Sequence, residues 1–196
     1  MQSLTSDPES RPESVGDAER RAVELLATTP AALLFIDIPL EHAATRKLLE
    51  RVPDGSFDWR PHERSRSLGE LATHVADLPN RGLSVLTSDG MDILQRVPVA
   101  PGATTAELLA RHDESTTRLQ AALDAASLGM LLAPWTMRRG SEVVVSAPRH
   151  LLVRRLMMSH LIHHRAQLGV YLRLLDVPLV GMYGPSADDG PPKPTT

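Results

Sequence analysis

Residues 146–178 read SAPRHLLVRRLMMSHLIHHRAQLGVYLRLLDVP. Apolar residues recur there at intervals of three and four, which predicts a long amphipathic helix from about Ala147 to Leu175. We expect Ser146 to cap this helix and the segment Asp176-Val177-Pro178 to end it. The predicted inner face carries Val153, Met157, Leu168, Tyr171 and Leu175.

Three further helical blocks precede this helix in the sequence. The first runs from about residue 18 to residue 51. Thr29 and Pro30 have the pattern of an N-cap followed by proline at the first helical position. Pro39 interrupts the block, so we expect it to be kinked or to form two helices.

The second and third blocks each open with the motif of a capping box, Ser67 with Glu70 and Thr104 with Glu107. Pro79 is expected to bend or end the second helix. The predicted inner faces carry Leu68, Leu71, Val75 and Leu78 in the second helix and Leu108, His112, Leu119 and Leu123 in the third.

Four amphipathic blocks with polar connections predict an all-α fold, a four-helix bundle. Residues 134–145, PWTMRRGSEVVV, are compatible with a small β-hairpin between the third and fourth helices. We expect one domain over residues 17–186. Residues 1–16 and 187–196 are rich in proline and polar residues and are expected to be disordered.

Composition excludes several classes of function. A net charge of -3 leaves no basic field for nucleic acid. No apolar stretch is long enough to span a membrane and no signal peptide is present, so cytoplasmic localisation is expected. The chain has no cysteine, so a metal must bind to histidine or carboxylate, and any thiol must come from another molecule.

The chain has eight histidines, and two of them have metal-ligand spacing. His160 and His164 lie four residues apart, so both project from one helix face and can bind one ion. They share the predicted inner stripe, where two unpartnered imidazoles would be costly. His74 also points inward and is the expected third ligand, while His163 is a weaker candidate.

The remaining histidines and the neighbouring residues exclude other kinds of site. His42, His62, His112 and His150 are isolated and are expected on the surface or in packing. Leu161 stands where an H-E-x-x-H protease needs glutamate. The fourth helix has no glutamate for a di-iron site, and a zinc deaminase needs cysteine. Mononuclear coordination by histidine alone is what these residues allow.

Two segments resemble DinB/YfiT-like proteins: RPHERSRSLGELATHVADLP at 60–79 and HLIHHRAQLGVYLRLLDVPLVGMYGPSADD at 160–189. The resemblance covers roughly residues 30–189. It rests on a lone histidine in the second helix and H-x-x-x-H-R-x-Q in the fourth. Ala166 stands where glycine is common in the family.

The resemblance implies that His74, His160 and His164 hold one divalent metal ion, namely nickel, zinc, iron or manganese. It also implies a four-helix bundle that is often a homodimer, and exposed apolar residues are a second reason to expect a dimer. The residues expected to provide that apolar surface are Phe35, Ile36 and Ile38.

Three functions fit an open three-histidine site. The first is transfer of a low-molecular-weight thiol, of the bacillithiol or mycothiol type, to a small electrophilic substrate. The second is metal-dependent hydrolysis of a small molecule, and the third is non-enzymatic metal binding or interaction. Arg165 and Tyr171 are candidates to orient anionic groups, although a surface ion pair for Arg165 and core packing for Tyr171 also explain them. Glu70 can orient His74, but the capping box already accounts for it.

Overall fold

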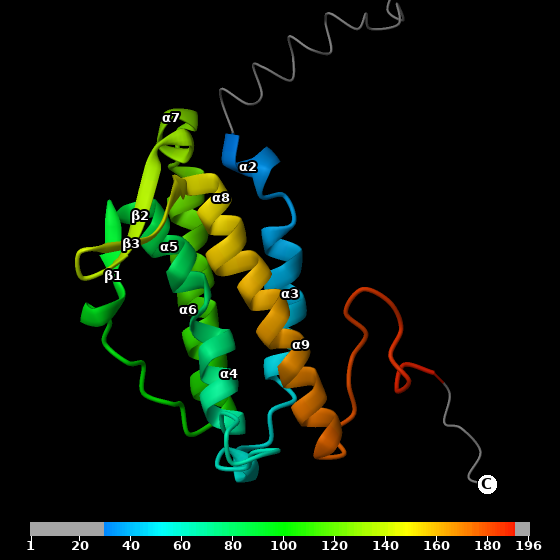
Figure 1. The fold of residues 1–196 in the computed structure, drawn as a ribbon. Helices are drawn as coiled ribbons and strands as arrows, with labels where there is room; N and C mark the ends of the chain where they lie inside the picture. The colour runs from blue at the N-terminus through cyan, green and yellow to red at the C-terminus, as the bar shows by residue number, and fades with distance from the viewer. Residues whose placement is uncertain (1–29, 191–196) are drawn as a thin grey trace, which may run out of the picture.

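The fourth helical block is one continuous helical segment (Figure 1). It consists of α8 (Arg149–Val153), a π-helical turn (Arg154–Met158) and α9 (Ser159–Leu174). The computed structural model describes residues 30–190. The predicted N-cap is wrong, because Ser146 lies in strand β3 and pairs with Thr136. The helix begins after Pro148, and the amide of Arg149 donates to the carbonyl of Ala133 instead.

The first block forms two helices, α2 (Pro30–Leu34) and α3 (Ile38–Leu49). Pro39 lies in the first turn of α3, where its missing N–H costs nothing, so the predicted division into two helices is confirmed. Arg154 binds Asp37 between these helices at 3.0 Å. The predicted cap at Thr29 and the start near residue 18 lie outside the described residues.

Helices α4 (Leu68–Asp77) and α5 (Pro79–Thr87) follow a polar loop. Both bonds of the predicted capping box between Ser67 and Glu70 are present. The interruption expected at Pro79 is confirmed, because α4 ends at Asp77 and Pro79 begins α5. In α6 (Thr105–Asp124), Thr104 caps as expected. Glu107 accepts from the amide of Ala103 rather than that of Thr104, so the predicted second bond is wrong. A short α7 (Leu128–Leu132) follows.

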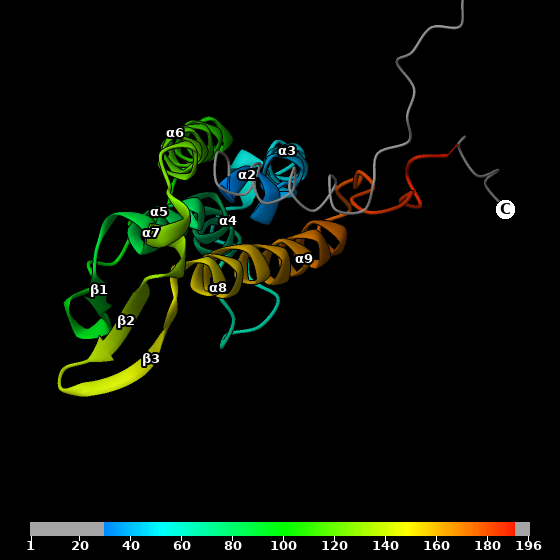
Figure 2. The ribbon, with the colours of Figure 1, turned by 90° about the horizontal axis from the view of Figure 1, so that it is seen from above.

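These helical segments lie side by side, and the view along them shows the sheet at one edge (Figure 2). Helix α4 packs against α6 and α9, and α3 packs against the same two helices. One core cluster lies toward the sheet and includes Phe35, Trp135 and Met157. The other fills the end that holds α4 and α9 and includes Leu49 and Leu161. The expected predominance of helix is confirmed.

A three-stranded sheet joins the helices, with strand order β1-β2-β3. Strands β2 (Pro134–Arg139) and β3 (Glu142–Pro148) are antiparallel, as the predicted hairpin required, and Gly140 turns between them with φ +59°. The sequence did not predict β1 (Gly90–Asp92), which runs parallel to β2. A Cβ at Gly90 would lie 2.5 Å from the carbonyl oxygen of Thr136, so this pairing requires glycine.

Two of the three residues expected to form a dimer surface are buried, and the third is exposed. Phe35 and Ile38 are buried in this chain, whereas Ile36 is 72% exposed. The homodimer therefore stays a prediction. Of the three apolar residues expected to support it, only Ile36 is exposed. Within residues 30–190, no helix has the length and hydropathy needed to cross a bilayer. Of the two ends predicted to be disordered, 1–16 and 187–196, residues 1–16 and 191–196 lie outside the described residues. Residues 187–190 are described, and there Asp188 accepts from the amide of Leu179 at 2.8 Å.

Candidate functional site

Three histidines from two packed helices converge on one point. His74 lies in α4, and His160 and His164 lie one turn apart in α9. Each ring offers one nitrogen as a ligand atom, and these three nitrogens all lie within 4.8 Å of one another. The Nε2 of His160 is 3.3 Å from that of His74 and 2.9 Å from that of His164. The structure thus brings together the three predicted ligands.

The spacings from the Nε2 atom of His160 to the Nε2 atoms of His74 and His164 fit a shared metal ion. Two imidazole nitrogens bound at about 2.1 Å stand about 3.0 Å apart at a right angle, and about 3.4 Å apart at a tetrahedral angle. The observed 2.9 Å and 3.3 Å between Nε2 atoms match this range. Within residues 30–190, no carboxylate joins the group, so a divalent ion there would keep its full charge.

The surroundings keep the three imidazoles neutral. Burial, followed by the positive charge of Arg66, lowers the pKa of His74 to about 3. Burial also lowers the pKa of His160 to about 4, and that of His164 is lowered for the same reason. Neutral imidazole is the form that binds metal, so the nitrogens are ready to coordinate at neutral pH.

His163 stands apart from this group. Its side chain is exposed, and its ring centroid lies 4.8 Å from that of His164. Its nitrogens do not belong to the set of converging ligand atoms. The geometry therefore separates two consecutive histidines, one facing the group and one facing outward.

Gln167 fixes the orientation of one ligand. Its Oε1 lies 2.7 Å from Nδ1 of His164. When this oxygen accepts from Nδ1–H, the lone pair of His164 remains on Nε2, which faces the other two rings. Partners of this kind orient metal-binding histidines and raise their basicity. The sequence placed Gln167 in the H-R-x-Q motif without giving it a role.

Replacing Gln167 with alanine should lower metal affinity about 10–100-fold, because the orienting bond to His164 is lost. Competition with a chromophoric chelator measures the affinity. Gln167→Glu keeps an acceptor oxygen and should bind metal nearly as well as the wild type. Equal loss in both variants would contradict this role.

Arg165 and Tyr171, the predicted anion-orienting residues, are held by other protein groups. Arg165 is buried and pairs with Glu41 at 2.5 Å, so its ion pair is internal rather than on the surface. The Tyr171 ring packs edge-on against Trp59 with 5.6 Å between centroids. Their role toward a substrate stays a prediction. Glu70 accepts from the amide of Ser67 at 2.6 Å, as its capping role requires.

A cavity of about 450 Å³ opens beside His74. Its walls come from α4 and from the loop after β1. The lining residues are Arg66, Glu70, Thr73, His74, Asp77, Ile93, Arg96, Pro98, Val99 and Pro101. Sequence reasoning missed Arg66 and Arg96 here, since isolated arginines in polar loops carry no motif. The cavity gives a small molecule access to His74, one member of the histidine group.

Two of the four isolated histidines form a buried pair. The rings of His42 and His112 meet edge to face with 5.7 Å between centroids. Burial, followed by the charges of His112 and Arg165, lowers the pKa of His42 to about 4, and burial lowers that of His112. His62 is exposed and His150 is partly buried, so these four lie on the surface or in packing.

Metal-free protein should lose stability as the pH falls from 6.5 toward 4. The unfolded chain protonates His42 below its ordinary pKa of 6.5, whereas the folded protein does so only near 4, so acid favours unfolding. This residue alone should contribute about 3 kcal/mol. Urea unfolding across this interval measures the slope, and His42→Leu should reduce it. An unchanged slope would contradict the prediction.

Comparison with known proteins identifies the family. Residues 40–168 match the family model of the DinB superfamily. That match covers more than half of the chain, and the chain therefore belongs to the DinB superfamily. Among curated proteins, none matches the sequence.

Several solved structures share the fold. The DinB-like protein YjoA of Bacillus subtilis is 19% identical, with a TM-score of 0.55 over 74% of this chain and 94% of that chain. A DinB-like protein of Bacillus cereus ATCC 10987 is 18% identical, with a TM-score of 0.61 over 76% and 95%. A protein assigned to the DinB family from Exiguobacterium sibiricum 255-15 is 25% identical, with a TM-score of 0.53 over 76% and 95%.

Proposed function

We propose that this protein is a divalent-metal enzyme of four-helix-bundle type that transfers a low-molecular-weight thiol to a small electrophile. The observation that carries this proposal is the convergence of three imidazole nitrogens beside an open cavity. His74, His160 and His164 would hold the ion. Three protein ligands leave coordination positions for a thiol or a substrate.

The charge of the site favours a thiolate over neutral ligands. A divalent ion supplies Lewis acidity and lowers the pKa of a bound thiol toward neutrality. The three histidines are neutral and no carboxylate belongs to the group within residues 30–190, so an incoming anion would meet uncompensated positive charge. Since the chain has no cysteine, the thiol must be a cosubstrate.

The residues of the chain position and shield the reacting groups. The imidazoles of His160 and His164 are held by the regular turn of α9, and Gln167 fixes the second of them. The cavity wall of Ile93, Pro98 and Val99 would exclude water from the substrate beside His74. Exclusion of water strengthens electrostatic interactions within a site.

The test uses metal-loaded protein without a His-tag and mixes a low-molecular-weight thiol with epoxides, halides or maleyl compounds. Adduct should form faster than in the absence of protein, and chelation of the metal should abolish the excess rate. Hydrolysis of esters or amides without thiol would instead support the hydrolase. If neither reaction occurs in protein that contains metal, the thiol-transfer proposal is wrong and a non-enzymatic metal site is favoured.

A further inference from the structure

A second cavity lies on the face of α9 opposite the histidine group. It has a volume of about 480 Å³ and lies between α9 and the segment that follows it, residues 178–189, here called the C-terminal segment. Ile162, in its wall, is two residues from both His160 and His164, which is about 200° around an α-helix. The volume falls within the range of roughly 300–1,000 Å³ that small-molecule sites occupy. Nine of the twelve lining residues are apolar, so the wall is a surface on which apolar groups can be buried.

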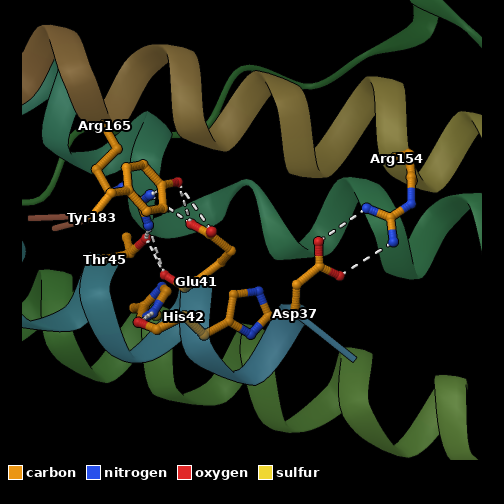
Figure 3. A network of polar contacts seen from close by, with 8 residues as sticks. Asp37, Glu41, His42, Thr45, Arg154, Arg165 and Tyr183 are labelled. Carbon is orange, nitrogen blue, oxygen red and sulfur yellow. Dashed lines mark hydrogen bonds and ion pairs between the residues drawn. The ribbon is translucent and has the colours of Figure 1, made fainter. Parts of the chain in front are cut away.

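The polar ends of the other three lining residues already have partners. Arg165 pairs with Glu41, and Tyr183 donates to the same carboxylate at 2.8 Å (Figure 3). Arg173 pairs with Asp188 at 2.6 Å. Each guanidinium charge is therefore matched by a carboxylate, and a charged ligand would find no free counter-charge among the lining residues, all of which the structure describes. This favours an uncharged ligand, since burial of an unpaired charge is costly.

The C-terminal segment is tied to two helices beside the cavity. Asp188 pairs with Arg173 of α9, and Tyr183 donates to Glu41 of α3. Within the segment, the amide of Leu179 donates to Asp188 at 2.8 Å. In Figure 1 the segment leaves the end of α9 and turns back beside the helices. An α-helix with its side chains is about 10 Å wide, so a partner helix could not reach this part of α9 unless these contacts broke. A small molecule can enter the cavity while they remain.

Gly169 leaves space in the wall of the cavity that the chain itself does not use. Within residues 30–190, a Cβ at this position would meet no packed side chain within 4 Å. Gly169 lies inside α9 and has no positive φ, so its backbone does not require glycine either. Because glycine destabilises a helix relative to alanine, a ligand that needs the space is a reason for it. The neighbouring side chains of Val170 and Leu174 are 60% and 58% exposed, and a ligand would cover them.

We propose that this cavity binds an uncharged apolar small molecule, which lies on Ala166, Gly169 and Val170 of α9 and is covered by Leu179 and Met182 of the C-terminal segment. A cavity of about 150 Å³ takes up one benzene molecule, so this one has room for a hydrocarbon body of about three such rings. The flexible side chain of Met182 can adapt to the shape of the ligand. The site does not depend on the proposed metal centre, because the two lie on opposite faces of α9.

The test is a fluorescence titration of the untagged full chain with N-phenylnaphthylamine, an uncharged three-ring probe whose emission rises in apolar surroundings. Binding should saturate at about one probe per chain. Gly169→Leu fills the open space and should weaken binding about tenfold or more. Gly129→Leu is the matched control, because it makes the same substitution at an exposed position of α7 that does not line the cavity, and it should bind like the wild type.

Val170→Asp places a charge in the cavity wall and should weaken probe binding as well. Val170 is exposed, so this variant remains informative even if Gly169→Leu fails to fold. Saturable binding that is lost in these two variants and kept in Gly129→Leu supports the site. Absence of saturable binding, or binding that is unchanged in both cavity variants, overturns it.

Two further measurements test the class of the occupant. Anilinonaphthalene sulfonate has the same rings with an added anionic group and should bind more weakly than the uncharged probe. If it binds more tightly, the assignment to an uncharged ligand is wrong. Light scattering gives the mass of the wild type and of Gly169→Leu. A dimer that becomes a monomer in this variant would show that a second copy of the chain, rather than a small molecule, covers this face of α9.

Discussion

Replacing His160 with alanine should abolish stoichiometric metal binding. The wild type is expected to bind about one ion per chain, because the three ligand nitrogens gather at a single point. His160 contributes the Nε2 atom that lies within 3.3 Å of both other rings, so its removal leaves two nitrogens that no third ligand joins. The loss should exceed the factor of about 10–100 that removal of a residue hydrogen-bonded to a ligand costs.

Alanine substitutions of His74, His164 and the neighbouring His163 complete this experiment. His74→Ala and His164→Ala should each reduce affinity to a similar extent. His163→Ala is the matched control, since it removes an exposed imidazole from the same helix turn. Elemental analysis and chelator competition on untagged protein provide the measurement. A filled site in His164→Ala together with an empty one in His163→Ala would show that the ligand set is wrong.

Local chemistry explains which parts of the fold the sequence predicts. The caps at Ser67 and Thr104 and the helix breaks at Pro39 and Pro79 depend on residues within a few positions of one another. The gathered histidines were predictable for a related reason. Inward spacing in two helices predicts a meeting point once the helices pack together.

The π-helical turn shifts the centre of the buried face of the last helix. It contains about one more residue per turn than an α-helix, so every later side chain is rotated around the axis. Tyr171 and Leu175 of the predicted face pack against the core but are only partly buried, whereas Leu161, Arg165 and Leu172, which were not predicted, are buried. Such a turn depends on how both ends of the helix fit the core, and no local motif marks it.

Long-range pairing explains the rest of what the sequence did not predict. Strand β1 has three residues and pairs with a strand more than 40 positions later. Its position sets the path of the following loop, which carries Arg96 to the cavity beside His74. Arg66 and Arg96 come from two separate segments, so spacing along the chain could not reveal that they line one cavity.

Replacing Glu41 with alanine should destabilise the protein by about 3–5 kcal/mol, as removal of one partner from a buried ion pair does. Figure 3 shows the network in which Glu41 of α3 faces Arg165 of α9. The Arg165 side chain is 3% exposed and that of Glu41 is 12% exposed. Arg165 also donates to Thr45 at 3.1 Å, and Tyr183 donates to Glu41 at 2.8 Å. Without Glu41, the buried guanidinium would keep hydrogen bonds but lose its neutralising charge.

Denaturant unfolding followed by circular dichroism measures this effect, and the thermal midpoint should fall by roughly 10 °C. Glu114→Ala is the control, because Glu114 pairs with Arg118 at 3.9 Å on the exposed surface and should contribute less than about 1 kcal/mol. The double variant Glu41→Leu/Arg165→Leu should recover much of the loss, since it leaves no buried charge unpaired. If Glu41→Ala is as stable as Glu114→Ala, the ion pair is not what holds α3 against α9.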